Sequence, residues 1–282
     1  MRLIEIVDSI KCEEIEYFLS FHKYYFHLNL FDQLDSTNQY ILENISLYSN
    51  SPKIPVVAVE NQTKGRGRRK HRWFSNSLGS LTFSLLLNFD LNFKYLSGLS
   101  LLISLCLVRV FVKLAPADYR IKWPNDILFN ERKISGILIE SKNDIYRGVS
   151  VVIGVGVNVK LPKQFISNIE YPITDLYQIT ARRLNRNQLL AHFLIELYQL
   201  LNVFQIKGFE PFRKEWMRLH YYHNKSVELH LPNKKTIVGV VAGVTNEGQL
   251  ILKTANGLQN FAIGDISLRS KVSQANDIYI SC

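Results

Sequence analysis

The chain has 282 residues, of which 47% are hydrophobic and 21% are charged. This length exceeds the usual span of one domain, and the composition is that of a globular protein, so a disordered or collagen-like chain is excluded. Lysine and arginine outnumber aspartate and glutamate by 34 to 24, and the resulting net charge of +10 favours an anionic partner, such as a phosphate, a nucleic acid, an acidic protein or a membrane surface.

Cysteine usage and hydropathy bear on the compartment. The three cysteines are far apart, which suits neither a zinc site nor a disulfide framework. Glu5 and Asp8 interrupt the apolar stretch at the N-terminus, so it does not resemble a signal peptide. The strongest candidate for a membrane span, residues 95–108, is shorter than the roughly 20 residues that a spanning helix needs. We therefore expect a cytoplasmic protein without a membrane span.

The N-terminal part combines an irregular segment with the first predicted elements. Residues 1–30 form an aromatic-rich lead-in, in which residues 12–26 could form an amphipathic helix. Residues 35–38, Asp-Ser-Thr-Asn, place hydroxyl and amide side chains before a helical apolar pattern, where helix caps occur. Taken alone, these four residues predict only a cap. Residues 54–59 are almost continuously apolar, which is typical of a strand buried on both faces.

A basic loop follows this strand directly. Between residues 64 and 70 it contains five cationic residues and two glycines. Glycine lets the backbone approach a ligand closely, and arginine binds phosphate through charge-assisted hydrogen bonds. The loop is not a dinucleotide-binding fingerprint, because Lys70 stands where the third glycine is needed, and it lacks the Gly-Lys-Ser/Thr of a Walker loop. It either orders around an anionic ligand or is a solvated basic turn or a nucleic-acid-binding patch.

The remaining sequence divides into an α/β part and a C-terminal β part. Apolar patterning predicts strands over residues 78–89, 127–129, 133–140 and 148–160 and helices over residues 98–113, 187–205 and 211–219. From residue 224 onward, short alternating runs separated by turn residues predict a small β barrel. The expected division is residues 1–30 as the lead-in, 31–223 as the larger domain, 224–270 as the barrel and 271–282 as a tail.

The segment Lys-Trp-Pro-Asn-Asp at residues 122–126 is the least easily explained by structure alone. Proline fixes its own φ and keeps Trp123 extended, so Asn125 and Asp126 are presented at a rigid corner. A carboxylate there could orient a lysine or hold a magnesium ion. A hairpin turn after this corner would bring Lys133 close to Asp126, although an exposed lysine at a strand end fits the same pattern.

Three motifs occur in a fixed order: Gly-Arg-Gly-Arg-Arg at residues 65–69, Lys-Trp-Pro-Asn-Asp at residues 122–126 and Lys-x-x-Gly-Ile-Leu at residues 133–138. In this order and spacing they closely resemble the motifs of biotin protein ligases. The motif at residues 35–38, the strand at residues 154–158 and Ser-Leu-Arg at residues 267–269 match the same pattern, so the resemblance spans about residues 31–270. It implies an α/β (α+β) fold with a mixed, largely antiparallel sheet backed by helices, as in class II synthetase cores, followed by a small SH3-like barrel.

The resemblance also implies an activity. Such an enzyme activates biotin with ATP to form biotinyl-5'-AMP, with Mg²⁺ as cofactor, and then transfers the biotinyl group to one lysine of a biotin carboxyl carrier domain of a carboxylase. Both steps require control of charge, because the biotin carboxylate must approach an α-phosphate that is itself an anion. A homodimer is compatible with the resemblance.

Site residues follow from the same resemblance, residue by residue. The catalytic residues would be Lys133, Asp126 and Arg68. Biotin would need donors and acceptors for its ureido ring, an apolar cover for its valeryl chain and space for its two fused rings. The residues that would bind it are Ser36, Thr37, Asn38, Gln62, Gly65, Arg66, Arg68, Trp73, Lys133, Gly136 and Gly154. ATP would contact Arg66, Arg68, Arg69, Arg72, Asn125, Lys133 and Asn158, with Tyr171 over the base. Asp126 would orient Lys133, bind the metal or accept a proton, and Lys70, His71 and Arg72 are alternative phosphate contacts.

Three alternatives belong to other classes. A biotin-responsive repressor would carry a winged helix-turn-helix before the Asp-Ser-Thr-Asn motif, but only 34 residues precede that motif, so we expect no specific DNA binding. A lipoate or octanoate ligase of the same superfamily is disfavoured by the basic loop and by Lys-Trp-Pro-Asn-Asp. A generic nucleic-acid-binding module is disfavoured because aromatic and basic residues do not alternate along the chain.

Overall fold

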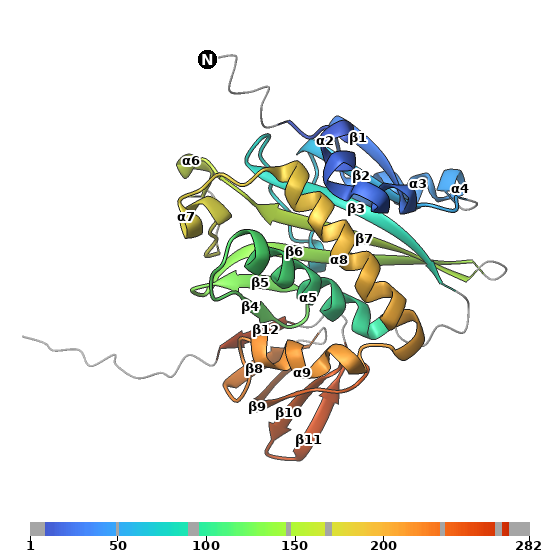
Figure 1. Cartoon of the computed structure of the whole chain (residues 1–282). Coiled ribbons are helices and arrows are strands. Elements are labelled where there is room, and N and C mark those ends of the chain that lie inside the picture. The colour runs from blue at the N-terminus through green and yellow to red at the C-terminus, as the bar shows by residue number, and fades with distance from the viewer. Residues whose placement is uncertain are drawn as a thin grey trace, which may run out of the picture.

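The computed structural model describes residues 9–48, 51–89, 96–144, 148–166, 171–231, 235–262 and 267–270. Within them, a seven-stranded sheet has the order β1-β2-β3-β7-β6-β5-β4, and a five-stranded sheet has the order β11-β10-β9-β8-β12 (Figure 1). In the large sheet β1 and β2 pair in parallel, whereas the other neighbours pair antiparallel. The predicted mixed, largely antiparallel sheet is therefore confirmed.

The large sheet carries most of the polar motifs. Its strands are β1 (Phe26–Leu34), β2 (Ile54–Gln62), β3 (Ser80–Phe89), β4 (Arg120–Lys122), β5 (Asp126–Phe129), β6 (Arg132–Asp144) and β7 (Gly148–Asn158). The apolar run in β2 is continuous because both of its faces are covered: Val56 and Ala58 belong to the main core, and Val57 belongs to a second core on the opposite face.

The helices form the layers on both sides. They are α2 (Cys12–Leu19), α3 (Thr37–Glu43), α4 (Ile45–Tyr48), α5 (Leu96–Leu114), α6 (Lys163–Ile166), α7 (Leu176–Thr180), α8 (Arg186–Lys207) and α9 (Glu210–Leu219), with 3₁₀ turns η1 (Ser20–Tyr25) and η2 (Arg68–Lys70). Figure 1 shows α5 and α8 side by side over one face of the large sheet, with α9 next to the C-terminal sheet.

Helix α5 continues through the arginine that interrupts its apolar run. Arg109 forms ion pairs of 2.8 Å with Glu196 of α8 and 2.6 Å with Glu215 of α9, so its charge is compensated between three helices. Two helices of the described chain, α5 and α8, are long and apolar enough to cross a membrane, but 72% of the apolar window in α5 is buried inside the fold. Such burial is typical of the core helix of a soluble protein.

The lead-in segment packs on the larger domain. Ile10 N donates to Glu60 at 2.6 Å, and Asn187 of α8 accepts from Lys11 N at 2.9 Å and donates to Glu14 at 2.8 Å. The boundary predicted between residues 30 and 31 lies within β1, and α2 contributes Ile15 and Leu19 to the main core. One side of α2 is therefore part of the folded core.

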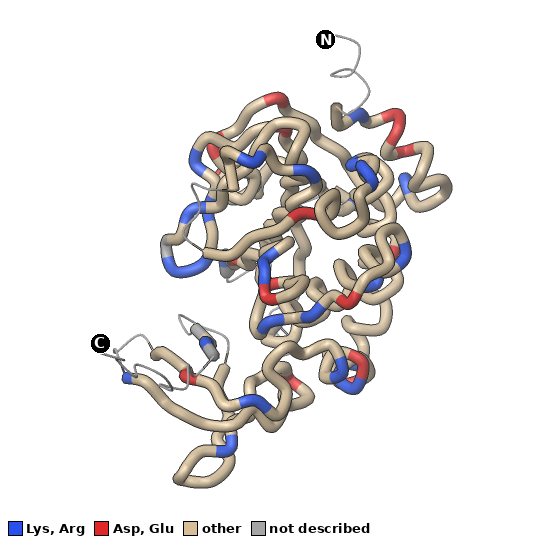
Figure 2. Tube along the Cα trace, turned by 90° about the vertical axis from the view of Figure 1, so that its left-hand side faces the viewer, with Lys and Arg blue, Asp and Glu red and all other residues tan. Residues whose placement is uncertain are grey.

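The C-terminal part is the second sheet, with strands β8 (Ser226–His230), β9 (Thr236–Val244), β10 (Leu250–Thr254), β11 (Gly257–Phe261) and β12 (Ser267–Ser270). Its first strand starts at Ser226, and both the domain boundary at residue 224 and the closure into a barrel remain predictions. Its turn between β9 and β10 contacts the larger domain, because Trp123 Nε1 donates to Gly248 O at 3.2 Å and Ser97 Oγ donates to Glu247 O at 2.6 Å. Figure 2 shows lysine and arginine along the traces of both parts.

A buried histidine next to this junction makes stability depend on pH. His220 is 4% exposed, packs on the Trp216 ring at 4.7 Å between centroids, and has no hydrogen-bond partner on either ring nitrogen within the described residues. Burial, with smaller contributions from His223 and Lys225, lowers the pKa of His220 from 6.5 to about 3. Between these values the unfolded chain binds a proton that the folded chain does not bind, so this contribution to stability is complete above pH 6.5 and is lost as the pH falls.

We therefore expect the free energy of unfolding to fall by up to about 1.4 kcal/mol for each pH unit below pH 6 because of this one group. Denaturant unfolding of the wild type and of His220→Phe at pH 7 and pH 5 measures the difference. His220→Phe should lose part of the pH dependence, and His27→Gln, at an exposed histidine, should keep it. Equal pH dependence in wild type and His220→Phe would contradict the assignment.

Candidate functional site

Three glycines lie close together on one face of the large sheet. Gly136 of β6 pairs with Gly156 of β7, and Gly154 of β7 pairs with Leu138 of β6. A side-chain carbon added at any of the three would overlap a side chain from elsewhere in the chain. These overlying side chains are Lys133 at Gly136, Asn38 at Gly154 and Trp73 at Gly156. The space left by the glycines is thus filled by protein side chains.

Lys133 reaches this face because β6 contains a bulge. The pairing of β5 with β6 skips Ile134, which is the extra residue of the bulge and shifts the alternation of faces. Lys133 therefore shares a face with Gly136 and crosses it, which places Nζ 2.7 Å from Asp126 Oδ1. Of the roles predicted for Asp126, orientation of the lysine is the one that this geometry favours.

The environment of Lys133 keeps it charged. Its side chain is 20% exposed, and burial by itself would lower its pKa, as does Arg68. Asp126 and Tyr171 outweigh these effects, so the pKa of Lys133 is raised above its ordinary value. Its Nζ also lies 5.7 Å from the ring centroids of both Trp73 and Tyr171. Lys133 is therefore a fixed cation and hydrogen-bond donor near neutral pH rather than a base.

A chain of polar side chains lies at the other end of the same face. Thr37 N and Thr37 Oγ1 donate to Gln62 Oε1 at 2.8 and 3.2 Å. The hydroxyl oxygen of Ser84, on β3, lies 2.6 Å from both Thr37 Oγ1 and Asn38 Oδ1. Ser36 caps α3 through Gln39 N, as its position in the sequence predicts. This cap holds the start of α3 against the sheet and presents its hydroxyl and amide groups there.

The basic loop is a short hairpin that closes over this face. Trp73 N donates to Gly65 O at 3.0 Å, and Gly67 N donates to His71 O at 2.7 Å. A side-chain carbon at Gly65 would overlap the carbonyl of Trp73, so glycine is required where the two arms of the hairpin approach each other.

Its arginines point to different partners. Arg66 Nη2 lies 2.8 Å from Glu140 Oε2, and Arg68 Nη1 donates to Asn125 Oδ1 at 3.2 Å. Arg69 is exposed and has a positive φ of 54°, and Arg72 donates to the backbone oxygen of Thr63 at 2.8 Å.

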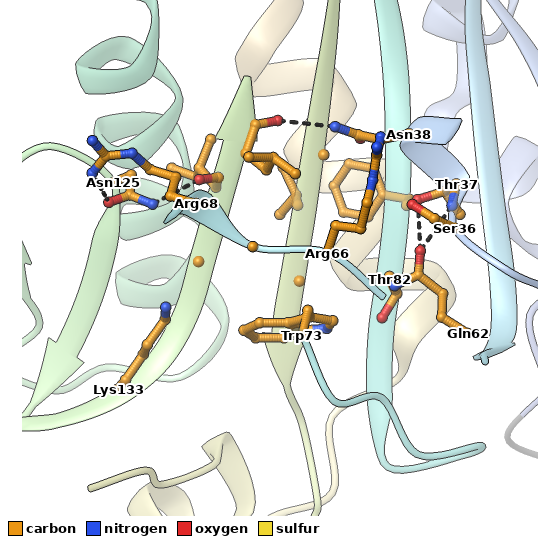
Figure 3. Close-up of a pocket in the computed structure, with 18 residues that line it drawn as sticks. Ser36, Thr37, Asn38, Gln62, Arg66, Arg68, Trp73, Thr82, Asn125 and Lys133 are labelled. Carbon is orange, nitrogen blue, oxygen red and sulfur yellow. Dashed lines mark hydrogen bonds between the residues drawn. The ribbon is translucent and has the colours of Figure 1, made fainter. Parts of the chain in front are cut away.

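These groups surround a pocket between the loop and the sheet (Figure 3). Of the residues predicted from the sequence, those that line it are Ser36, Thr37, Asn38, Gln62, Arg66, Arg68, Trp73, Asn125, Lys133, Gly136 and Gly154. Predicted residues outside its lining are Gly65, Arg69, Arg72, Asp126 and Asn158. The sequence analysis missed Gly67, Thr82, Phe83, Ile137, Leu138, Val155 and Gly156, most of which lie on predicted strands. Thr82, Leu138 and Gly156 share the pocket face with Gly136 and Gly154 by strand alternation, which was the available signal for these three residues.

A second, smaller hollow adjoins the first at Lys133. It is lined by Trp73, Phe74, Lys133, Asn158, Tyr171 and Ile173. The amide nitrogen of Asn158 donates to Lys133 O at 3.3 Å and to Thr174 O at 3.0 Å, which fixes the segment around Tyr171 beside β6. In the same way Asn125 Nδ2 donates to Ile137 O at 2.8 Å. Both amides predicted to meet adenine thus have structural partners within the protein.

The comparisons with known proteins agree with this arrangement. Residues 30–158 match the Biotin/lipoate A/B protein ligase family, and residues 222–269 match the Biotin protein ligase C terminal domain. The bifunctional ligase/repressor BirA of Escherichia coli is 32% identical over 241 residues, which cover 84% of this chain and 72% of that protein. The chain belongs to the biotin protein ligase family.

Two further members of this family support the assignment. The biotin–[acetyl-CoA-carboxylase] ligase of Mycobacterium tuberculosis is 25% identical over 244 residues, 85% of this chain and 88% of that protein. The structure of biotin protein ligase from Aquifex aeolicus in complex with biotin and ATP superposes with a TM-score of 0.73 at 28% identity, covering 86% of this chain and 99% of that chain. The fold and the resemblance inferred from the motifs are therefore confirmed.

The contact between Gly156 and Trp73 predicts how one added methyl group changes stability and the exposure of Trp73. In Gly156→Ala the new carbon would overlap the Trp73 indole, which is too rigid to yield, so Trp73 must leave the sheet. We expect the melting temperature to fall, since overpacking costs about 1–3 kcal/mol. We also expect a larger fraction of tryptophan fluorescence to be quenched by iodide, because Trp123 and Trp216 stay buried.

Two variants make this measurement specific. Adding Trp73→Phe to Gly156→Ala should abolish the extra quenching. Gly257→Ala should cause none, because it strains a turn with a positive φ but brings the added carbon within 4 Å of no other heavy atom. Quenching in Gly156→Ala equal to that of the wild type would show that Trp73 does not lie on Gly156.

Proposed function

We propose that this chain is a biotin protein ligase that condenses biotin with ATP to biotinyl-5'-AMP and pyrophosphate, and then transfers the biotinyl group to a lysine of a carboxylase carrier domain. The observation that carries the proposal is the pocket in which Lys133, held charged by Asp126, faces Arg68 at one end and a set of uncharged polar groups at the other. A member of the same family, from Aquifex aeolicus, has been crystallised with biotin and ATP.

The end of the pocket next to α3 suits the ring system of biotin. A ureido group has one carbonyl acceptor and two N–H donors, and it needs partners of both kinds when it leaves water. Ser36, Thr37 and Gln62 offer hydroxyl and amide groups there, while Trp73 offers apolar surface for the rest of the molecule. Biotin would thus lie with its rings near α3 and its carboxylate towards Lys133.

The charged end suits the reacting groups. The biotin carboxylate and the α-phosphate repel each other, and cations fixed in advance reduce this repulsion without reorganising when the bond forms. Lys133 is fixed by Asp126, and Arg68 is held by Asn125. In this step a carboxylate oxygen of biotin forms a bond to the α-phosphorus, and the bond from that phosphorus to the leaving pyrophosphate breaks.

The base and the outer phosphates are assigned to the region around the second hollow. Tyr171 lies beside Lys133 there, and its ring offers a surface on which adenine can stack. Arg69, His71 and Arg72 are exposed on the loop and stay candidates for the outer phosphates. The side chain of Lys70, a further candidate, lies outside the described residues.

Magnesium is assigned to the substrate, as MgATP. A magnesium ion in such sites keeps several waters and binds substrate phosphates with one or two carboxylates. Asp126 Oδ1 already pairs with Lys133 at 2.7 Å. Asp126 is therefore proposed as the positioning partner of Lys133, which remains near the carbonyl when the acceptor amine attacks and AMP leaves.

The cellular context belongs to the same proposal. The partner is a biotin carboxyl carrier domain, the compartment is the cytoplasm, and a homodimer is compatible with the activity. Specific DNA binding is not part of the proposed function, and an operator-binding assay at physiological salt would show only weak, salt-sensitive association.

The direct test is incubation of the protein with biotin, MgATP and a carrier domain, followed by intact-mass measurement. A gain of one biotinyl group on the carrier domain, absent when its acceptor lysine is replaced by arginine, is expected. A parallel reaction with lipoate or octanoate should give no such gain. Transfer of lipoate in place of biotin would overturn the proposal.

The variant Lys133→Ala tests the charged end. Loss of a fixed cation at the reacting phosphate should cost about 3 kcal/mol of transition-state stabilisation, or roughly a 150-fold lower rate of adenylate formation. Equilibrium binding of biotin should stay largely intact, and Lys160→Ala, at a lysine that packs on Tyr177, should react as the wild type does. Exchange of pyrophosphate into ATP at the wild-type rate in Lys133→Ala would exclude the role.

The variant Arg68→Gly tests retention of the intermediate. A charge-assisted bond to phosphate is worth about 1.5 to 3 kcal/mol, so its loss should raise the escape rate of biotinyl-5'-AMP by about one to two decades. Released adenylate acylates lysines without recognition, so serum albumin added to the reaction should become biotinylated. If Arg68→Gly makes adenylate but labels albumin no more than the wild type, then Lys70, His71 or Arg72 is the better candidate for retention.

A further inference from the structure

Glu140 connects the basic loop to the polar end of the pocket. Its Oε2 accepts from Arg66 Nη2 at 2.8 Å and from Asn38 Nδ2 at 2.8 Å. Figure 3 shows Arg66 and Asn38 on the same side of the pocket, with Lys133 at the opposite end. One carboxylate oxygen therefore joins a residue of the loop to the first turn of α3, although Glu140 itself is not part of the pocket lining.

The position of Glu140 on β6 follows from strand alternation. Gly136, Leu138 and Glu140 are separated by two residues each and so share the face on which the pocket lies. Glu140 pairs with Val152 of β7 in the register that also sets Leu138 opposite Gly154. The carboxylate is thus held by the central sheet and is 28% exposed, so it is a fixed anchor for the Arg66 guanidinium of the loop.

The contact also decides which way the Asn38 amide points. Asn38 Nδ2 faces Glu140 and, at 3.3 Å, Leu138 O, and these acceptors leave Asn38 Oδ1 towards Ser84 at 2.6 Å. A carboxylate accepts hydrogen bonds only, so it excludes the flipped amide. Ser84 in turn continues to Thr37. The orientation of the polar groups that would meet the ureido ring therefore depends on a side chain outside the pocket.

We infer that Glu140 is a positioning residue for biotin: through Arg66 it holds the basic loop over the ring end of the pocket, and through Asn38 it sets the donors and acceptors there. This inference rests on the proposed function for the identity of the ligand. It separates the loop arginines by task, with Arg66 assigned to the biotin end and Arg68 to the phosphate end.

The test compares the steady-state kinetics of pyrophosphate release for the wild type and Glu140→Ala. Losing both charge-assisted bonds should raise KM for biotin about ten- to hundredfold, while KM for ATP and kcat change less than about threefold. Glu140→Gln should fall between the two, because its amide oxygen still accepts a hydrogen bond but carries no charge. Glu131→Gln, at an exposed carboxylate at the turn before β6, should match the wild type.

A double-mutant cycle separates this role from a general loss of structure. If Glu140 acts through Arg66, Glu140→Ala should raise KM for biotin much less in an Arg66→Met background than in the wild type. Additive effects in the cycle, an unchanged KM for biotin in Glu140→Ala, or an equal rise of KM for ATP would each overturn the inference. A folding defect would appear as a fall in melting temperature together with kcat, which Glu140→Gln should not show.

Equilibrium titration of biotin by calorimetry makes the inference independent of the reaction. Glu140→Ala should bind biotin about ten- to hundredfold more weakly than the wild type. If the wild type binds biotin but transfers it to no carrier domain, the proposed function fails while the role of Glu140 stands. If both proteins bind biotin equally, the role of Glu140 fails and the proposed function stands.

Discussion

The site depends on three missing side chains. At Gly136, Gly154 and Gly156 a single methyl group would occupy the space of Lys133, Asn38 or Trp73. The rigid Trp73 ring at Gly156 cannot absorb such an overlap, whereas the flexible end of Lys133 at Gly136 can shift. Gly156 is therefore the strictest requirement of the shallow depression that the glycines leave in this face of the sheet. Side chains from β6, α3 and the basic loop fill it and converge on one pocket, although they are far apart in the sequence.

The same arrangement keeps the cations of the pocket paired without placing their carboxylate partners in the pocket lining. Lys133 and Arg66 line the pocket, whereas their carboxylate partners Asp126 and Glu140 do not. Each cation therefore keeps a partner that offsets the cost of its partial burial, while the surface presented to a ligand stays positive. Without these partners the cations would repel one another, and carboxylates in the pocket lining would repel an anionic substrate. The carboxylates behind the wall keep the cations in place without competing for the ligand.

The sequence predicts which residues belong to the site better than it predicts how they are arranged. The motifs predict most of the pocket, and the near-continuous apolar run predicts β2, because burial on both faces demands it. The bulge at Ile134 is not predictable, since a skipped partner leaves no mark in hydrophobic patterning. The roles of Ser84 and Glu140 are not predictable for a related reason. Each lies within a strand, where a polar residue is predicted to face solvent unless its tertiary contacts are known.

The C-terminal sheet takes part in the site through the corner at residues 122–126. Trp123 is 1% exposed and donates to Gly248 O, so the side of the corner away from the pocket is fixed by the turn between β9 and β10. Burial lowers the pKa of Lys122, and the positive charges of Lys133 and of Arg269 on β12 lower it further, whereas Asp126 raises it. A charge on the C-terminal sheet therefore acts on a residue of the corner. Pro124 fixes its own φ within this short corner. The corner therefore joins the contact with the turn between β9 and β10 at Trp123 to the carboxylate of Asp126 that pairs with Lys133.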